Sequence, residues 1–503
     1  MLNLRNPSPR RFVVLGGGTA GWFAAITLRR IFSSEVEVQV IESSEIGIVG
    51  VGEGGLLNFI GALKHNNIDI GEFIRETGAT WKWGFSYEGW RTGKEDDRFF
   101  HLFASQDTSV SRWQERSTWP YLSALVNQQV ELDRYISASD LIRNNASQPE
   151  ATALLDTQSA GVIPSFHFDS YKLATYLKKV ALSRGVTHLD AIVEEIVADE
   201  RGHVREVRTA GERIELDFLI DASGLSRKVI GRKEMGSCWQ SFKDYLLMDS
   251  AIPFYMPHPL KNPGLVTRAI TMDAGWMWQI PLQERVGAGY VFSSKHLSEK
   301  EAVAEVEKRL GFGIEPHKTL RFDPGCYEEV WKGNVMALGL SSGFVEPLEA
   351  TSIGQMLEQL VSFERTIVSC QGVISDQAVC DFNEANLRSW QGIRDFLRMH
   401  YDGARSDTPL WQEVAKAPYP ESYRALREAW QERMPRMTDV ERDAINGWRG
   451  IFHPVNWTLV AAPMGVLTPH AAEMDLRILT PEKRDEALRF ARLLKRRASG
   501  EAN

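Results

Sequence analysis

The glycine-rich segment at residues 12–22 constrains the fold of this chain more than any other stretch. Four apolar residues, Phe-Val-Val-Leu, lead into three glycines whose spacing fits G-x-G-x-x-G, and an amphipathic run follows at once. The pattern predicts a buried strand, a tight turn and a helix whose N-terminus faces a pyrophosphate. The residues expected to contact this dinucleotide are Gly16, Gly18, Thr19, Ala20 and Gly21.

A second strand and an acidic residue support this interpretation. Residues 36–41 read Val-Glu-Val-Gln-Val-Ile, and Glu42 follows about 20 residues after the last glycine of the motif, where a carboxylate can bond a ribose hydroxyl. The alternative is an ordinary glycine-rich turn with a surface glutamate. The combination of strand, turn, helix, strand and acid favours dinucleotide binding.

Composition excludes several other classes of protein. The net charge of -8 does not favour nucleic acid or an anionic membrane surface. The four cysteines form no C-x-x-C pair, and the eleven histidines include no H-E-x-x-H, so we expect neither a disulfide framework nor a metal. The first residues are polar and basic and run straight into a strand, so we expect no signal peptide and a cytoplasmic location.

A second glycine-rich stretch follows at residues 46–55. Its glycines alternate with Ile and Val, which is more typical of backbone lying against a flat ligand than of a flexible linker. We expect its cofactor contacts to be Gly50, Val51, Gly52 and Glu53. Two later buried strands also end in glycine at turns that face a ligand, and these add Asp221 and Gly339 to the expected cofactor residues.

The remaining pattern predicts an α/β protein with a second layer. Short antiparallel strands are expected at residues 248–254, 266–271, 275–281 and 287–293. Helices are expected at residues 56–74, 131–147, 171–184, 302–310, 353–369 and 377–399, and through most of 421–490. We therefore expect residues 1–380 to form a cofactor-binding module with an inserted antiparallel sheet. Residues 381–503 are expected to form a mainly helical cap on the substrate side.

Two aromatic stretches carry polar side chains of interest. Lys82 lies between Trp81 and Trp83, and His101 lies within Phe-Phe-His-Leu-Phe, which ends at Phe103. A lysine on such an element is usually solvated, and a histidine there is usually a hydrogen-bonded core residue. On these grounds alone, a structural role is favoured over a functional one for both Lys82 and His101.

Three motifs together resemble the flavin-dependent halogenases, the tryptophan-halogenase-like family. They are the N-terminal glycine motif, W-x-W-x-I-P at residues 276–281, and G-F-x-E-P-L-E-x-T at residues 343–351. Residues 393–401 and 407–411 are also similar to that family, so the likeness extends from residue 12 to about residue 411. It implies an FAD-binding, flavin monooxygenase-like fold of the two-dinucleotide-binding type, with an antiparallel sheet layer and a C-terminal helical cap.

The resemblance also implies a mechanism. Reduced FAD and O2 give a C4a-hydroperoxide, a chloride or bromide ion attacks it, and hypohalous acid travels down a substrate tunnel within residues 1–380 to a lysine at a separate site. There it halogenates an electron-rich, indole-like ring. No nicotinamide site is evident, so we expect FADH2 to diffuse from a separate NAD(P)H-dependent reductase. A homodimer is possible.

The family motifs assign roles to individual residues. Lys82 matches the catalytic lysine and Glu349 the glutamate that takes the ring proton. Trp276 and Trp278 would flank the flavin and hinder substrate binding there. The remaining expectations are Thr351 and Ser352 for the halide, and His101, Phe103 and Trp457 for the substrate.

Two departures from the family bear on specificity. Ala350 and Ser352 replace the usual Ser and Gly around Thr351, so we expect an altered halide pocket that favours bromide. Residues 443–448 offer no counterpart of the Tyr-Tyr and Glu set that holds free tryptophan. An indole-like ring is therefore favoured, and a carrier-bound substrate stays open.

Two other functions compete with halogenation. An aromatic flavin hydroxylase commonly has Gly-Asp at the third flavin contact, but here Leu340 follows Gly339. A non-catalytic flavin-binding redox sensor would need neither Lys82 nor Glu349.

Overall fold

The structure is a computed structural model, and it describes most of the chain. The described residues are 1–4, 10–32, 34–47, 50, 52–103, 119–157, 161–259, 262–440 and 450–500. Two expectations from the sequence lie outside these ranges: the cofactor contact of Val51 and the reading of residues 443–448.

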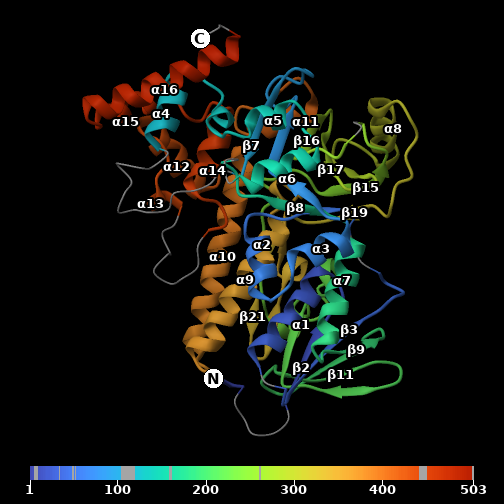
Figure 1. The fold of residues 1–503 in the computed structure, drawn as a ribbon. Coiled ribbons are helices and arrows are strands. Elements are labelled where there is room, and N and C mark those ends of the chain that lie inside the picture. The colour runs from blue at the N-terminus through green and yellow to red at the C-terminus, as the bar shows by residue number, and fades with distance from the viewer. Residues whose placement is uncertain are drawn as a thin grey trace.

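A six-stranded sheet forms the lower half of the molecule in Figure 1. Its order is β21 (Trp331–Lys332), β22 (Val335–Ala337), β13 (Phe218–Asp221), β2 (Arg10–Leu15), β3 (Val36–Glu42) and β9 (Thr187–Asp190). All neighbours are parallel except β21 and β22. The apolar runs of β2 and β13 are fully buried because helices cover the sheet. These helices include α1 (Thr19–Ile31), α7 (Ser170–Ser183) and α9 (Thr351–Ser369).

A larger sheet lies above the first in Figure 1. Its seven strands are β19 (Leu320–Arg321), β15 (Ser250–Met256), β18 (Val286–Phe292), β17 (Gly275–Pro281), β16 (Thr267–Met272), β6 (Gly84–Glu88) and β7 (Arg98–Leu102). Its pairs are antiparallel except β16 with β6. The expected antiparallel layer is confirmed. It also recruits two strands from early in the chain, because β6 pairs with β16 and β7 pairs with β6, which places His101 opposite Phe85 at one edge of the sheet.

Four smaller sheets complete the described part of the fold. The first consists of β4 (Glu53–Gly54), β8 (Ser165–Phe168) and β5 (Thr80–Lys82), and it places the second glycine-rich stretch beside Lys82. The others are β14 (Trp239–Ser241), β20 (Gly325–Tyr327) and β23 (Gly343–Phe344); β10 (Glu195–Ala198), β11 (Val204–Arg208) and β12 (Arg213–Glu215); and β1 (Leu2–Asn3) with β24 (Val373–Ile374).

The last part of the chain is helical, as the sequence predicts. Its helices are α10 (Asp376–Met399), α11 (Pro409–Lys416), α12 (Glu421–Glu432), α13 (Met437–Val440), α14 (Pro454–Ala461), α15 (Pro469–Arg477) and α16 (Pro481–Ser499). The long helix α10 runs along the parallel half and continues to the upper helices (Figure 1). Helix α4 (Trp119–Asn127) packs against α15 and α16, so an early segment takes part in the helical region.

Two of the expected helices are broken in the structure. Residues 56–74 form α2 (Asn58–His65) and the start of α3 (Ile70–Thr77), separated by a turn in which Asn67 has φ 51°. Residues 131–147 form a short 3-10 turn and α5 (Ser139–Arg143). Here buried Asp133 accepts hydrogen bonds from Ser139 and Arg143, which satisfies its carboxylate without a continuous helix. The other helices are α6 (Gln148–Asp156) and α8 (Glu299–Leu310).

Within the described ranges, no helix is both long and apolar enough to span a bilayer.

Candidate active site

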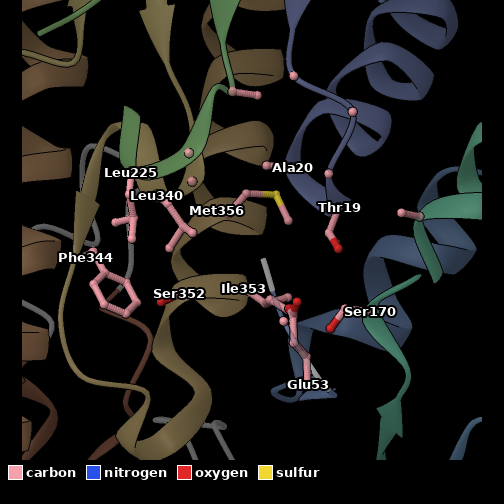
Figure 2. A pocket seen from close by; sticks show the side chains of 18 of the residues that line it. Thr19, Ala20, Glu53, Ser170, Leu225, Leu340, Phe344, Ser352, Ile353 and Met356 are labelled. Atoms are coloured by element: carbon pink, nitrogen blue, oxygen red, sulfur yellow. The ribbon is translucent and has the colours of Figure 1, made fainter. Parts of the chain in front are cut away.

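A cavity of about 800 Å³ lies at the carboxyl ends of the parallel strands. The lining includes most of the expected cofactor residues: Gly16, Gly18, Thr19, Ala20, Glu42, Gly50, Gly52, Glu53, Trp276, Trp278 and Gly339. Figure 2 shows Thr19, Glu53 and Ser170 on one side and Leu340, Phe344 and Met356 on the other. The volume of this cavity suits a large organic ligand.

The glycines of the first turn are required by close backbone approach. A Cβ on Gly16, which has φ +118°, would lie 2.2 Å from the carbonyl oxygen of Ala222. A Cβ on Gly21 would lie 1.9 Å from the carbonyl oxygen of Gly16, so Gly21 fits the helix to the strand without lining the cavity. Helix α1 starts at Gly18 with no side-chain cap, which leaves its first N–H groups to face an anion. These features fit a dinucleotide cofactor.

Two acidic residues predicted to bind the cofactor differ in their surroundings. Glu42 lines the cavity, but its Oε1 lies 2.7 Å from Nζ of Lys178 and 3.0 Å from Nε2 of His188. Asp221 is fully buried behind the wall, and its Oδ2 accepts the backbone N–H groups of Val229 and Ile230. Asp221 therefore organises the turn after β13, while Glu42 and Lys178 are the groups near the cavity.

The tryptophan pair of β17 forms another wall of the cavity. The rings of Trp276 and Trp278 meet edge to face at 6.4 Å. The Nε1–H of Trp276 donates to Glu346 at 2.8 Å, and the hydroxyl of Tyr401 donates to the same carboxylate oxygen at 2.6 Å. A Cβ on Gly289 would lie 2.1 Å from Trp278. A glycine on the neighbouring strand is therefore needed to seat that indole.

Lys82 lies one residue behind the cavity wall. Its side chain is 0% exposed, and within the described part of the chain Nζ has no hydrogen-bond partner. Nζ sits 3.9 Å above the ring of Phe85 and 5.3 Å from that of Phe103. A Cβ on Gly54 would lie 2.7 Å from Nζ, and Gly54 and Phe85 both line the cavity.

Burial dominates the electrostatics of this lysine. It lowers the pKa of Lys82 from its ordinary value of 10.5 to about 7, although the nearby Glu349 carboxylate works in the opposite direction. The rings that surround the amine belong to Phe85 and Phe103. Trp81, the neighbour of Lys82 in the sequence, instead stacks on Phe166 at 4.8 Å.

Glu349 sits in a strained turn before α9. Its φ is 64° and that of Ala350 is 53°, a left-handed conformation that is costly for residues with a Cβ. The side chain is 0% exposed. Its Oε1 contacts the hydroxyl of Tyr87, Nδ1 of His101 at 2.7 Å and Nε2 of His400 at 3.1 Å.

The surroundings of Glu349 favour the carboxylate form. Burial alone would raise its pKa, but the charges and hydrogen bonds of His101 and His400 hold the pKa of Glu349 well below its usual range. Oε2 has no hydrogen-bond partner among the described residues. Lys82 and Glu349 are thus two buried groups, close enough to influence each other's charge.

The residues expected at the halide site begin helix α9. Ser352 lines the cavity, and Figure 2 shows it near Phe344 and Ile353. Thr351 is fully buried beside it, and its hydroxyl has no hydrogen-bond partner within the described ranges. Because Ala350 adopts the left-handed conformation just before them, the first N–H groups of this helix follow a sharp turn.

The three expected substrate residues lie beyond Lys82 and Glu349. His101 hydrogen-bonds to Glu349, and Phe103 lies near Lys82. Trp457 packs edge to face on Phe396 at 4.9 Å, while Phe396 stacks on Phe452 at 3.8 Å. All three are buried.

Sequence analysis missed several polar residues of this site. These are Tyr87, Glu346, His400, Tyr401 and Asn456. His400 and Tyr401 end the segment I-R-D-F-L-R-M-H-Y, which resembles the family as a block, and Glu346 is the first acid of E-P-L-E. Asn456 and Tyr87 carry no local sequence signal, because their roles depend on pairing between distant elements.

Comparison with known proteins agrees with this fold and identifies the family of the chain. The family model described as tryptophan halogenase matches residues 11–477. The protein y4xG of Sinorhizobium fredii is 41% identical over 495 residues, covering 98% of this chain and 97% of that protein. The tryptophan 6-halogenase SttH of Streptomyces toxytricini is 31% identical over 465 residues, covering 87% of each.

Solved structures extend the likeness to the whole fold. The structure of SttH matches with a TM-score of 0.82 at 26% identity, covering 97% of each chain. Xcc4156, a flavin-dependent halogenase from Xanthomonas campestris, matches with a TM-score of 0.81 at 27% identity, covering 98% of this chain and 95% of that one. The fold and site therefore define a flavin-dependent halogenase, and the chain belongs to the tryptophan halogenase family.

Proposed function

We propose that this enzyme uses FADH2, O2 and chloride or bromide to halogenate an electron-rich, indole-like aromatic ring. The observation that carries the proposal is the buried pair of Glu349, which lines the dinucleotide cavity, and Lys82, which lies immediately behind its wall. FAD would be held by the turn at Gly16 and Gly18, by the N-terminus of α1 and by the loop around Gly50 and Gly52. When reduced, it would supply the oxygen activation that converts halide to hypohalous acid.

Lys82 would receive the hypohalous acid. Because aromatic rings surround it and its pKa is about 7, the amine can donate a hydrogen bond to the acid or carry the halogen covalently. Gly54 separates it from the cavity with no side chain. Trp276 and Trp278 would fill the space beside the flavin, so an organic substrate would react at the lysine.

Glu349 would stabilise the cationic ring that forms when the substrate attacks the halogen. One C–X bond forms as the X–O bond breaks, and the hydroxide that leaves would take a proton from Lys82 to become water; the proton that Glu349 accepts from the ring would then restore the lysine. The ring then loses a proton to the carboxylate as its C–H electron pair restores aromaticity. His101, Phe103 and Trp457 would contribute to the substrate side, and a separate reductase would supply FADH2 by diffusion.

The test compares wild type with Lys82→Ala, using Lys64→Ala on exposed α2 as the matched control. The assay contains FAD, a reductase with NADH, O2, indole and bromide, and it measures halogenated product by mass and free hypohalous acid with a trapping reagent. We expect Lys82→Ala to lose product by about 100-fold or more while FAD binding and hypohalous acid formation persist. A hydroxylated product in wild type would contradict the proposal in favour of a hydroxylase. Normal FAD oxidation without a halogenated product across a panel of indoles, phenols and pyrroles would contradict it in favour of a non-halogenating flavoprotein.

The halide preference is a separate part of the proposal. Ala350 and Ser352 alter the turn that begins α9, so we infer that bromide is used faster than chloride. Turnover with each halide at equal concentration tests this. A clear chloride preference in wild type would overturn this inference. In that case Ala350→Ser should not change the halide preference, because Ala350 would not determine it.

A further inference from the structure

A directional chain of hydrogen bonds ends on one oxygen of Glu349. The backbone N–H of His453 donates to Oδ1 of Asn456 at 2.9 Å, which turns the amide nitrogen of Asn456 toward His101. That nitrogen lies 2.9 Å from Nε2 of His101. Since an amide NH2 only donates, Nε2 accepts, and the ring proton of a neutral His101 sits on Nδ1. Nδ1–H then donates to Oε1 of Glu349 at 2.7 Å.

A second chain reaches the same oxygen from the end of α10. Nδ1 of His400 lies 2.8 Å from the carbonyl oxygen of Phe396. A carbonyl only accepts, so Nδ1 carries a proton. Nε2 then donates to Oε1 of Glu349, at 3.1 Å, when the ring holds its second proton. The hydroxyl of Tyr87 also donates to Oε1 and lies 3.1 Å from Nε2 of His400.

These contacts give the two carboxylate oxygens different tasks. Oε1 lies within hydrogen-bond distance of three side chains, those of Tyr87, His101 and His400, whereas Oε2 has no hydrogen-bond partner among the described residues. We propose that Glu349 acts through Oε2 alone, and that Asn456 with His101, and His400 with Tyr87, are positioning residues that hold Oε1. This inference rests on the proposed halogenation for its kinetic consequences.

The arrangement suits an electrostatic role for the carboxylate. The titratable groups that face Glu349 come from four elements: Lys82 on β5, Tyr87 on β6, His101 on β7 and His400 after α10. Two imidazoles and one ammonium-bearing side chain surround a single anion. A weakly basic carboxylate still takes a proton from a halogenated cationic ring, because that ring is a far stronger acid. Its ionised state is therefore more useful than a high pKa.

His101 accordingly acts on Glu349 rather than only as a wall for the substrate. The two roles predict different kinetics. If His101 only contacts the substrate, losing that contact raises KM for the aromatic ring. If His101 positions Glu349, a displaced Oε2 lowers kcat and leaves KM unchanged. Variants of Asn456 distinguish the two roles of His101, because Asn456 hydrogen-bonds to Nε2, the ring nitrogen that does not contact Glu349.

The first experiment replaces Asn456 with Leu, and with Ala in case the larger residue disturbs packing. We expect kcat for aromatic halogenation to fall about tenfold with KM within twofold, while FAD binding and release of hypohalous acid stay at wild-type levels. A matched control is Asn383→Ala, since that amide holds the backbone of Val330 and Trp331 away from this site. A raised KM with unchanged kcat for the Asn456 variants would overturn the positioning role.

The second experiment compares His400→Gln, which keeps a donor, with His400→Phe, which removes it. We expect the glutamine variant to retain about tenfold more activity than the phenylalanine variant. Equal losses in the two variants would overturn the role of the His400 hydrogen bond.

A spectroscopic measurement tests the arrangement without any turnover. Infrared difference spectra between each protein and its Glu349→Gln counterpart report whether Glu349 is ionised. We expect the carboxylate signal to persist to lower pH in wild type than in the combined Asn456→Leu and His400→Phe protein. Identical titrations would overturn the inference even if halogenation is confirmed. Conversely, a wild type that halogenates no aromatic would refute the proposed function and leave this readout intact.

Discussion

Two glutamates of one four-residue motif, Glu346 and Glu349, experience opposite electrostatic environments. Both are buried, with exposed fractions of 1% and 0%. Burial raises the pKa of Glu346 from 4.5 to about 7, because the hydrogen bonds from Tyr401 and Trp276 offset only part of the desolvation. At Glu349 the same burial is overcome by His101 and His400, and the pKa falls well below its usual range.

The difference shows that the type of donor decides the charge of a buried carboxylate. A phenol and an indole are neutral donors, and they leave Glu346 able to hold a proton near neutral pH. Imidazoles can carry positive charge, so they stabilise the anion itself. Adjacent residues at the end of α10 serve both sites, since His400 reaches Glu349 and Tyr401 reaches Glu346. In the proposed function the carboxylate of Glu349 would face the aromatic chemistry, while that of Glu346 accepts a hydrogen bond from Trp276 in the cavity wall.

The largest expected contrast is in catalysis. Glu349→Gln removes the anion and should lower aromatic halogenation by about 100-fold to 1,000-fold. Glu346→Gln keeps an acceptor for Trp276 and should lower it by no more than about fivefold. Product formation by both variants at saturating FADH2 measures the contrast. Equal losses would mean that the two carboxylates share one catalytic task.

Lys82 extends the comparison, because it is the cation that faces Glu349. The unfolded chain keeps its amine protonated up to about pH 10.5, but the folded chain does so only up to about pH 7. Folding therefore releases a proton between these values, and stability rises with pH across that window. At 1.36 kcal/mol per pKa unit, burying Lys82 costs about 4 kcal/mol at pH 7 and about 2 kcal/mol at pH 9.

Lys82→Met should remove this cost. We expect the variant to melt at a higher temperature than wild type at pH 7, with the gap narrowing at pH 9. Lys64→Met on the exposed face of α2 is the control and should shift little at either pH. A gap that widens as the pH rises would contradict a lowered pKa for Lys82.

Glu346 should show the reverse slope with pH. The unfolded carboxyl loses its proton above about pH 4.5, but the folded one keeps it up to about pH 7. Folding therefore takes up a proton in this window, and stability falls as pH rises. The cost is about 1 kcal/mol at pH 5.5 and about 3 kcal/mol at pH 8.

Glu346→Gln should accordingly stabilise the protein more at pH 8 than at pH 5.5, as judged by thermal melting. Glu349→Gln should destabilise it at pH 8, because it removes the buried carboxylate oxygen that accepts hydrogen bonds from Tyr87 and His101. Shifts of the same sign for the two variants would remove the distinction between the sites.

Much of this arrangement could be predicted from local sequence, and part of it could not. The glycine motif specifies a strand, a turn and a helix within one short segment, and W-x-W-x-I-P lies on a single strand, so both were found. Lys82 and Glu349 were assigned through resemblance, while their roles are still proposals. Among the side chains that contact the two carboxylates, His101 and Trp276 were expected in other roles, whereas Tyr87, His400 and Tyr401 were missed. These three come from β6 and the end of α10, and only tertiary packing brings these elements together.

The same limit explains the surroundings of Lys82. Alternation along an extended strand correctly separates Lys82 from its tryptophan neighbours, but it cannot say what the lysine faces. Phe85 belongs to the next strand and Phe103 to the end of β7, and the pairing of β6 with β7 brings them together. The hydrophobic pattern also predicted one helix where the structure has α2 and α3, because the pattern does not show that Asn67 adopts a left-handed conformation.

The smallest expected effect separates His400 from its neighbour. Tyr401→Phe removes the 2.6 Å hydrogen bond to Glu346 and leaves the one from Trp276. Because that hydrogen bond stabilises the anion, its loss should raise the pKa of Glu346 above about 7 and cost about 1 kcal/mol of stability at pH 8. Thermal melting from pH 5.5 to 9 should show the falling limb extended to higher pH, with halogenation lowered by about threefold or less. His400→Phe acts on the other carboxylate, so it should lower halogenation far more and leave this limb in place. If Tyr401→Phe impaired halogenation as strongly as His400→Phe, the end of α10 would act as one unit, and the two glutamates could no longer be treated as separate sites.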